Sequence, residues 1–65
     1  MKDKDNFFTG LDEIGPVIGK FRDGANFEYL QDASLVCELL NRLCKCKDFK
    51  VFSEDNYSHY IYQEI

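Results

Sequence analysis

The sequence predicts an α+β fold in which an antiparallel sheet of about four strands, arranged as two hairpins, carries one amphipathic helix on one face. Apolar residues recur with a helical period over residues 32–46. Segments that alternate apolar and polar residues, separated by turn signals, lie before and after that helix. The predicted order is therefore strand, strand, helix, strand, strand. A chain of 65 residues is long enough for one domain and no more.

The N-terminal residues predict a charged tail followed by a single domain. Lysine and aspartate alternate over residues 2–5, and we expect residues 1–6 to form a flexible charged tail, with the domain spanning residues 7–65. Thr9 is followed three positions later by an acidic residue, which is the pattern of a helix-capping box. We therefore predict a helical turn over residues 10–14 that ends at Gly15-Pro16.

Two hairpins are predicted on either side of the long helix. Asp23-Gly24 is a strong tight-turn signal and lies between two apolar segments, residues 17–21 and 26–30, which we expect to pair. After the helix, residues 49–52 and 57–63 predict a second pair of strands with a polar turn between them.

The predicted helix has a wider apolar face than one sheet can cover. Asp32 is its expected N-cap residue. The expected core stripe is Val36, Leu39, Leu40 and Leu43. Further apolar residues, including Leu35 and the cysteines, widen the apolar arc to roughly 200°. We expect the excess to be covered by the N-terminal segment, by another subunit or by a partner.

Composition and charge limit the classes of function. Hydrophobic residues make up 45% of the chain and aromatic residues 15%, which is typical of a folded domain. The formal charge of -4 disfavours nucleic-acid binding, which needs clustered lysine and arginine. No segment has the length of a membrane span, and the charged N-terminus lacks a secretory signal pattern. Three cysteines cannot all pair within one chain, so we expect reduced thiols and a cytoplasmic location.

Candidate catalytic and metal-binding residues do not form a convincing site. Cys37, Cys44, Cys46 and His59 are the residues from which a zinc site would be assembled. However, Cys44 and Cys46 are separated by one residue, and in a helix their side chains would diverge by roughly 160°. The glycine spacing matches no phosphate-binding loop. We predict no enzyme activity, no metal and no cofactor, with a zinc-stabilised domain as a minor alternative.

Binding to another protein is the predicted function. Tyrosine is enriched in interfaces, and the C-terminal strand carries several; the alternative is packing against the strand at residues 49–52. The candidate contact residues are Tyr57, Tyr60 and Tyr62 on that strand, and Leu35 and Cys37 on the helix margin. A separate basic patch comprises Arg42, Lys45, Lys47 and Lys50.

By size and acidity the chain resembles the small proteins of phages and mobile elements that inhibit or sequester a larger host protein, and acidic immunity proteins are similar in that respect. The resemblance is one of composition and rests on no motif. It implies an inhibitor or adaptor that acts by steric occlusion of a larger protein. The alternative is a homodimeric structural protein or regulator that binds nucleic acid through the patch from Arg42 to Lys50.

Overall fold

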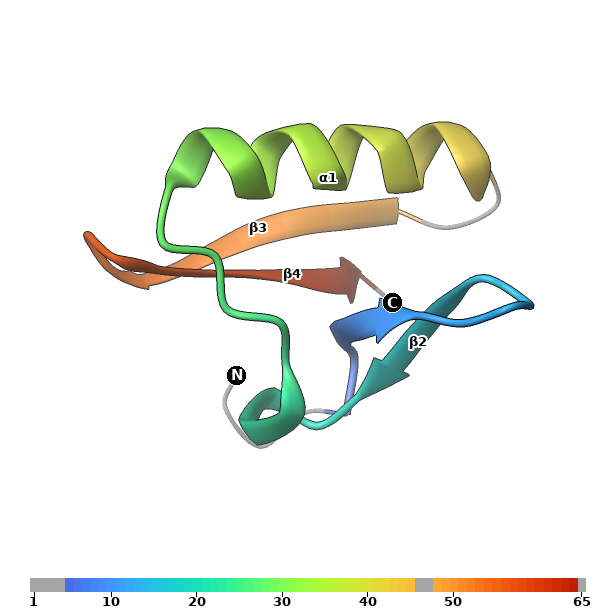
Figure 1. The fold of residues 1–65 in the computed structure, drawn as a ribbon, viewed down its shortest axis with the longest axis horizontal. Helices are drawn as coiled ribbons and strands as arrows, with labels where there is room; N and C mark the ends of the chain where they lie inside the picture. Colours follow the sequence, from blue (N-terminus) through green and yellow to red (C-terminus); the bar gives the residue numbers. More distant parts are fainter. Residues whose placement is uncertain (1–4, 46–47, 65) are drawn as a thin grey trace.

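The computed structural model describes residues 5–45 and 48–64 and confirms the predicted fold class (Figure 1). Its elements are β1 (Phe7–Leu11), β2 (Pro16–Gly19), the 3-10 helix η1 (Phe21–Asp23), α1 (Leu30–Leu43), β3 (Asp48–Asp55) and β4 (Ser58–Glu64). The four strands form one antiparallel sheet in the order β2-β1-β4-β3. Helix α1 packs along β3 and β4 (Figure 1). Within the described residues, no helix is long and apolar enough to cross a membrane.

The first hairpin lies earlier in the chain than the sequence predicts. The expected helical turn at 10–14 is wrong, because β1 extends to Leu11 and pairs with β2. The Asp12 carboxylate does not cap a helix. It accepts hydrogen bonds from the backbone N–H groups of Ile14 (2.8 Å) and Gly15 (3.0 Å), which closes the turn between the two strands.

The expected strand pairing of residues 17–21 with 26–30 is also wrong. Asp23-Gly24 ends the short helix η1 instead of forming a hairpin turn. In the following segment, Phe27 makes an isolated antiparallel bridge to His59. At His59, one edge of β4 is already paired with β3. Phe27 must therefore pair with the opposite edge of β4, which is the edge that pairs with β1 further along the strand. This segment therefore links β2 to α1 and adds one bridge to the sheet.

Helix α1 begins and ends earlier than predicted, and only part of the predicted core stripe is buried: Leu40 is, whereas Leu39 and Leu43 are not. Its N-cap residue is Tyr29, and Asp32 lies in the first turn. The buried side chains are Ala33, Cys37 and Leu40. The prediction that Leu39 and Leu43 are core residues is wrong, because both side chains are exposed. Val36, also predicted in the core, is half-buried against it.

The sheet is covered on both faces by apolar side chains. The face toward α1 holds the core of Phe8, Cys37, Leu40, Phe49 and Ile61. The opposite face holds a cluster of five aromatic rings: Phe7, Phe21, Phe52, Tyr60 and Tyr62. Strand β4 supplies both layers, because successive side chains point to opposite faces of a sheet.

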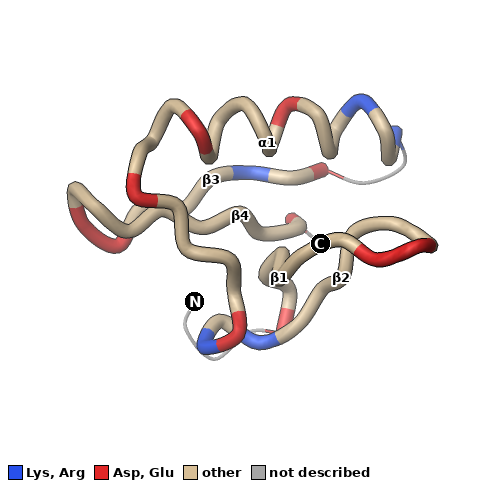
Figure 2. The backbone as a smooth tube through the Cα atoms, in the orientation of Figure 1, with Lys and Arg blue, Asp and Glu red and all other residues tan. Residues whose placement is uncertain are grey.

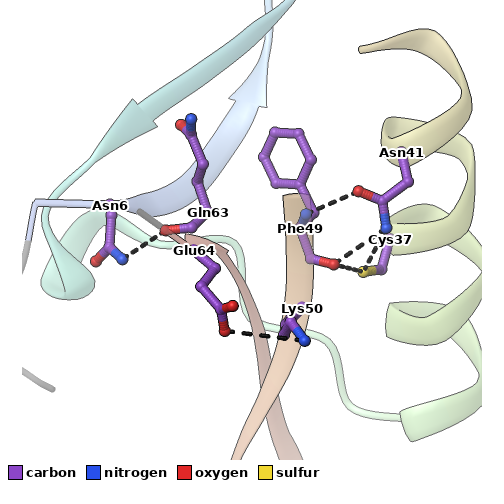
Figure 3. A network of polar contacts seen from close by, with 7 residues as sticks. All are labelled: Asn6, Cys37, Asn41, Phe49, Lys50, Gln63 and Glu64. Carbon is purple, nitrogen blue, oxygen red and sulfur yellow. Dashed lines mark hydrogen bonds and ion pairs between the residues drawn. The ribbon is translucent and has the colours of Figure 1, made fainter. Parts of the chain in front are cut away.

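Asn6, which was predicted to belong to a tail at residues 1–6, lies in the folded domain. Asn6 is buried, and its side-chain amide donates a hydrogen bond to the Gln63 carbonyl at 2.7 Å (Figure 3). The Asn6 carbonyl accepts a second bond from the Gln63 N–H at 2.7 Å. These two contacts join Asn6 to β4. Residues 1–4 lie outside the described residues.

Candidate interaction surfaces

The predicted tyrosine surface is mostly part of the aromatic cluster. Tyr60 is only 9% exposed and Tyr62 is half-buried, so the expectation that they form an open contact surface is wrong. The Phe21 and Tyr60 rings are 4.6 Å apart, and Phe52 lies 6.4 Å from Tyr60. Tyr57 differs, with 71% exposure in the turn between β3 and β4. The packing alternative therefore holds for Tyr60, which packs against Phe52, whereas Tyr62 packs against Phe7 of β1.

Cys37 also lies in the interior and cannot contact a partner in this structure. Its thiol donates a hydrogen bond to the Phe49 carbonyl at 3.2 Å (Figure 3). Burial raises the pKa of the Cys37 thiol, and the nearby Asp48 carboxylate raises it further. The thiol therefore stays protonated at neutral pH, which preserves its role as a hydrogen-bond donor.

One row of leucines on α1 is exposed to solvent. We call it the leucine ridge: Leu35 (53% exposed), Leu39 (54%) and Leu43 (75%). The three residues are four positions apart, so their side chains follow one another along the same side of the helix. Beside the ridge, the Arg42 guanidinium forms an ion pair with the Glu38 carboxylate at 2.7 Å. Of the two helix-margin residues predicted as contacts, Leu35 is exposed and belongs to this ridge.

A second exposed apolar group lies on the β1–β2 hairpin, and the sequence reasoning missed it. We call it the hairpin tip: Leu11, Ile14 and Val17. Ile14 is 96% exposed, the highest value among the large hydrophobic residues of the described chain. Asp12 and Glu13 lie directly beside it, and Figure 2 shows this acidic segment at the projecting end of the hairpin. The signal in the sequence that could have revealed this hairpin is Gly15-Pro16, because the pair is compatible with a hairpin turn as well as with the end of a helix.

The hairpin tip is held in one conformation by its own hydrogen bonds. Besides the two bonds to its carboxylate, Asp12 donates its N–H to the Gly15 carbonyl at 3.0 Å. The Thr9 hydroxyl donates to the Val17 carbonyl at 3.0 Å, next to the bulge in β1. Gly15 has φ 146°, which L-residues with a side chain rarely adopt. The turn therefore presents Ile14 on a fixed backbone.

Replacing Gly15 with alanine tests this account of the turn. No atom lies within 4 Å of the position that a Cβ would take, so steric crowding is not the obstacle. The positive φ alone should cost about 1–3 kcal/mol of folding free energy. Gly10→Ala is the matched control, since that site is equally open and its φ is not positive. Chemical denaturation of both variants measures the difference, and equal stability would contradict the assignment.

The predicted basic patch is divided in the folded chain. Arg42 projects from α1 and is paired with Glu38, whereas Lys50 is on β3, where its ammonium lies 3.8 Å from the Glu64 carboxylate (Figure 3). Lys45 is exposed just after the helix, and Lys47 lies outside the described residues. Figure 2 shows acidic residues interspersed with the basic ones. The described basic residues therefore present no continuous positive surface.

The residues considered for zinc are not gathered into a site. Within residues 5–45 and 48–64, no three histidine, cysteine or acidic side chains are grouped to hold a metal ion. Cys46 lies outside the described residues. His59 is buried and its Nδ1 lies 2.6 Å from the Ser53 hydroxyl, while its Nε2 lies 3.2 Å from the Asn56 carbonyl. Since a carbonyl only accepts, Nε2 carries a hydrogen, and His59 of β4 contacts both β3 and the turn at one end of the β3–β4 hairpin.

Comparison of the chain with protein-family models, with curated proteins and with solved structures finds no match.

Proposed function

We propose that this chain is a small non-enzymatic protein-binding module, acting as an inhibitor or adaptor that occludes part of a larger protein. The observation that carries the proposal is the hairpin tip, where Ile14 is almost fully exposed on a fixed turn. Isolated exposed apolar residues are common, but here Leu11 and Val17 are exposed on the same hairpin. A projecting apolar side chain of this kind fits a pocket on a partner.

The fixed turn favours binding because little conformational entropy is lost when it docks. Ordering a flexible loop at an interface costs about 0.5–1.5 kcal/mol for each immobilised side chain. In this hairpin, Asp12 and Thr9 already hold the backbone through the bonds described above. Full burial of the isoleucine side chain would contribute about 1.5–3 kcal/mol. Ile14 is therefore the expected anchor of the interface.

The charge around the tip specifies the chemistry of the partner surface. Glu13 is exposed beside Ile14, and the chain as a whole has a formal charge of -4. Complementary charges increase the association rate and discriminate against wrong partners. The expected partner surface is an apolar pocket with lysine or arginine at its rim. The expected partner is a larger protein of the host in which a phage or mobile element resides. The free thiols of Cys37 and Cys44 are compatible with a reducing compartment such as the cytoplasm.

The rival function, nucleic-acid binding through the basic patch, has less support. Phosphate recognition needs several cations on one surface. Arg42 is on α1 and Lys50 is on β3, and each of them already forms an ion pair with a carboxylate.

An affinity experiment with matched variants tests the proposal. The tagged chain is used to isolate partners from its native host, the partner is identified by mass spectrometry, and its affinity is then measured with purified proteins. Ile14→Ser should weaken binding about 10–100-fold, because an apolar anchor is lost while the fold is unchanged. Tyr57→Ala removes an exposed aromatic residue from the other hairpin turn and should change the affinity less than about twofold. Equal binding by wild type and Ile14→Ser would refute the hairpin tip as the contact.

A further inference from the structure

The leucine ridge is a separate apolar surface that the proposed function does not use. Leu35, Leu39 and Leu43 lie on α1, over the β3–β4 half of the sheet, whereas the hairpin tip belongs to the β1–β2 half (Figure 1). With a rise of about 1.5 Å per residue, neighbouring leucines of the ridge are about 6 Å apart along the helix axis. The ridge thus presents an evenly spaced row with Leu39 at its centre.

We infer that the ridge is occupied by the same ridge of a second copy of this chain, with the two α1 helices antiparallel and a twofold axis beside Leu39. In that arrangement Leu39 meets the partner's Leu39, and Leu35 meets the partner's Leu43. All three leucines of the ridge then find an apolar contact, because a row with a central residue is complementary to its own reverse. The opposed helix dipoles also favour this orientation.

The charges beside the ridge match the antiparallel arrangement. Glu38 and Arg42 flank the ridge on one side, and their side chains are 58% and 72% exposed. A twofold axis beside Leu39 places Arg42 of one copy about two residues, or about 3 Å along the axis, from the level of the partner's Glu38. Each arginine can therefore bind the carboxylate of the other copy while keeping its place on its own helix. Flanking pairs of this kind set the orientation of paired helices.

The size of the domain gives a physical reason for self-association. A core in a chain of 65 residues supplies only about 3–5 kcal/mol of stability, and small domains often add a second subunit. A stable interface buries about 800 Å² per partner. That is roughly a sixth of the 4672 Å² surface of the described chain, so the contact must extend from the ridge to its flanks. We therefore expect a reversible dimer of modest affinity.

Sedimentation velocity over about a hundredfold range of concentration tests the inference. The wild type should shift from the 7.6 kDa monomer toward twice that mass as concentration rises. Leu39→Glu should stay monomeric throughout and keep its helical circular dichroism, because the replaced side chain points to solvent. Leu11→Glu, which places the same charge on the hairpin tip, should dimerise like the wild type. A monomeric wild type, or a dimer that persists in Leu39→Glu, would overturn the inference.

Charge exchange and cross-linking test the orientation. Arg42→Glu should weaken the dimer by facing Glu38 of the other copy, and the double variant Glu38→Arg with Arg42→Glu should restore it. Leu39→Cys should form a disulfide-linked dimer under mild oxidation, since the two residues meet at the axis. Ser34→Cys, at an exposed position of α1 about 140° around the helix from Leu39, is the matched control and should not cross-link. Failure of the charge exchange to restore dimerisation would exclude the antiparallel arrangement.

These outcomes are independent of the proposed partner binding. Ile14→Ser should leave the dimer intact, and Leu39→Glu should retain the contact made by the hairpin tip.

Discussion

Phe7→Ala is expected to leave at least about half of the molecules unfolded at 25 °C. Phe7 has 0% exposure and lies at the centre of the aromatic cluster. Its ring is 5.0 Å from that of Phe21 and about 6 Å from those of Phe52 and Tyr62. Truncating a buried phenylalanine costs about 3–5 kcal/mol, which equals the whole stability expected of a domain this small.

The position of Phe7 in the sheet increases this effect. It pairs with Gly19 of β2 on one side and with Tyr62 of β4 on the other, so it joins the two hairpins. Loss of its side chain therefore loosens the contact between them as well as the aromatic cluster.

Urea denaturation and near-ultraviolet circular dichroism measure the effect. Tyr57→Ala is the matched control, because it removes an aromatic side chain that is mostly exposed, and it should cost less than about 1 kcal/mol. A cooperative transition in Phe7→Ala within about 1 kcal/mol of the wild type would show that the second layer contributes little.

Asn41→Ala is expected to lower the free energy of unfolding by about 2–3 kcal/mol. The side-chain amide of Asn41 pairs with the backbone of Phe49 as a neighbouring strand would (Figure 3). Its Oδ1 accepts from the Phe49 N–H at 2.7 Å, and its Nδ2 donates to the Phe49 carbonyl at 3.0 Å. Strand β3 is at the edge of the sheet, and Phe49 is buried, so the lost N–H partner is not replaced by water.

The measurement is thermal denaturation, in which a change of this size should lower the Tm by at least about 8 °C. Gln31→Ala removes an exposed side-chain amide from the same helix and should leave the Tm nearly unchanged. Alanine has the higher helix propensity at both positions, so the control also corrects for that gain. A Tm for Asn41→Ala equal to that of the control would show that the amide does not hold α1 to β3.

The fold class, the presence of the helix and the second hairpin were predictable because they depend on local patterns. Apolar residues at helical spacing mark α1 within two or three residues at each end. The predicted strand at 49–52 lies within β3, and the predicted strand at 57–63 coincides with β4 to within one residue at each end. The turn at Asn56-Tyr57 is close to the predicted position.

The first hairpin was missed because its signals are ambiguous at short range. A side-chain oxygen at Asp12 can accept from backbone N–H groups in a helix cap or in a hairpin turn. Whether the segment forms a helix cap or a hairpin turn depends on Phe7, which is buried and pairs with both β2 and β4. These pairings are between residues distant in sequence, so no local sequence pattern predicts them.

The sequence by itself determined that α1 has an apolar arc too wide for one sheet, while the tertiary structure decided which part of the arc is buried. Helical spacing shows which residues share a side of the helix, but an arc of roughly 200° can face the sheet in several rotations. The small side chains of Ala33 and Cys37 allow close approach, and the bonds from Asn41 to Phe49 fix the rotation. Leu39 and Leu43 are consequently left in solvent beside Leu35, and that rotation creates the leucine ridge.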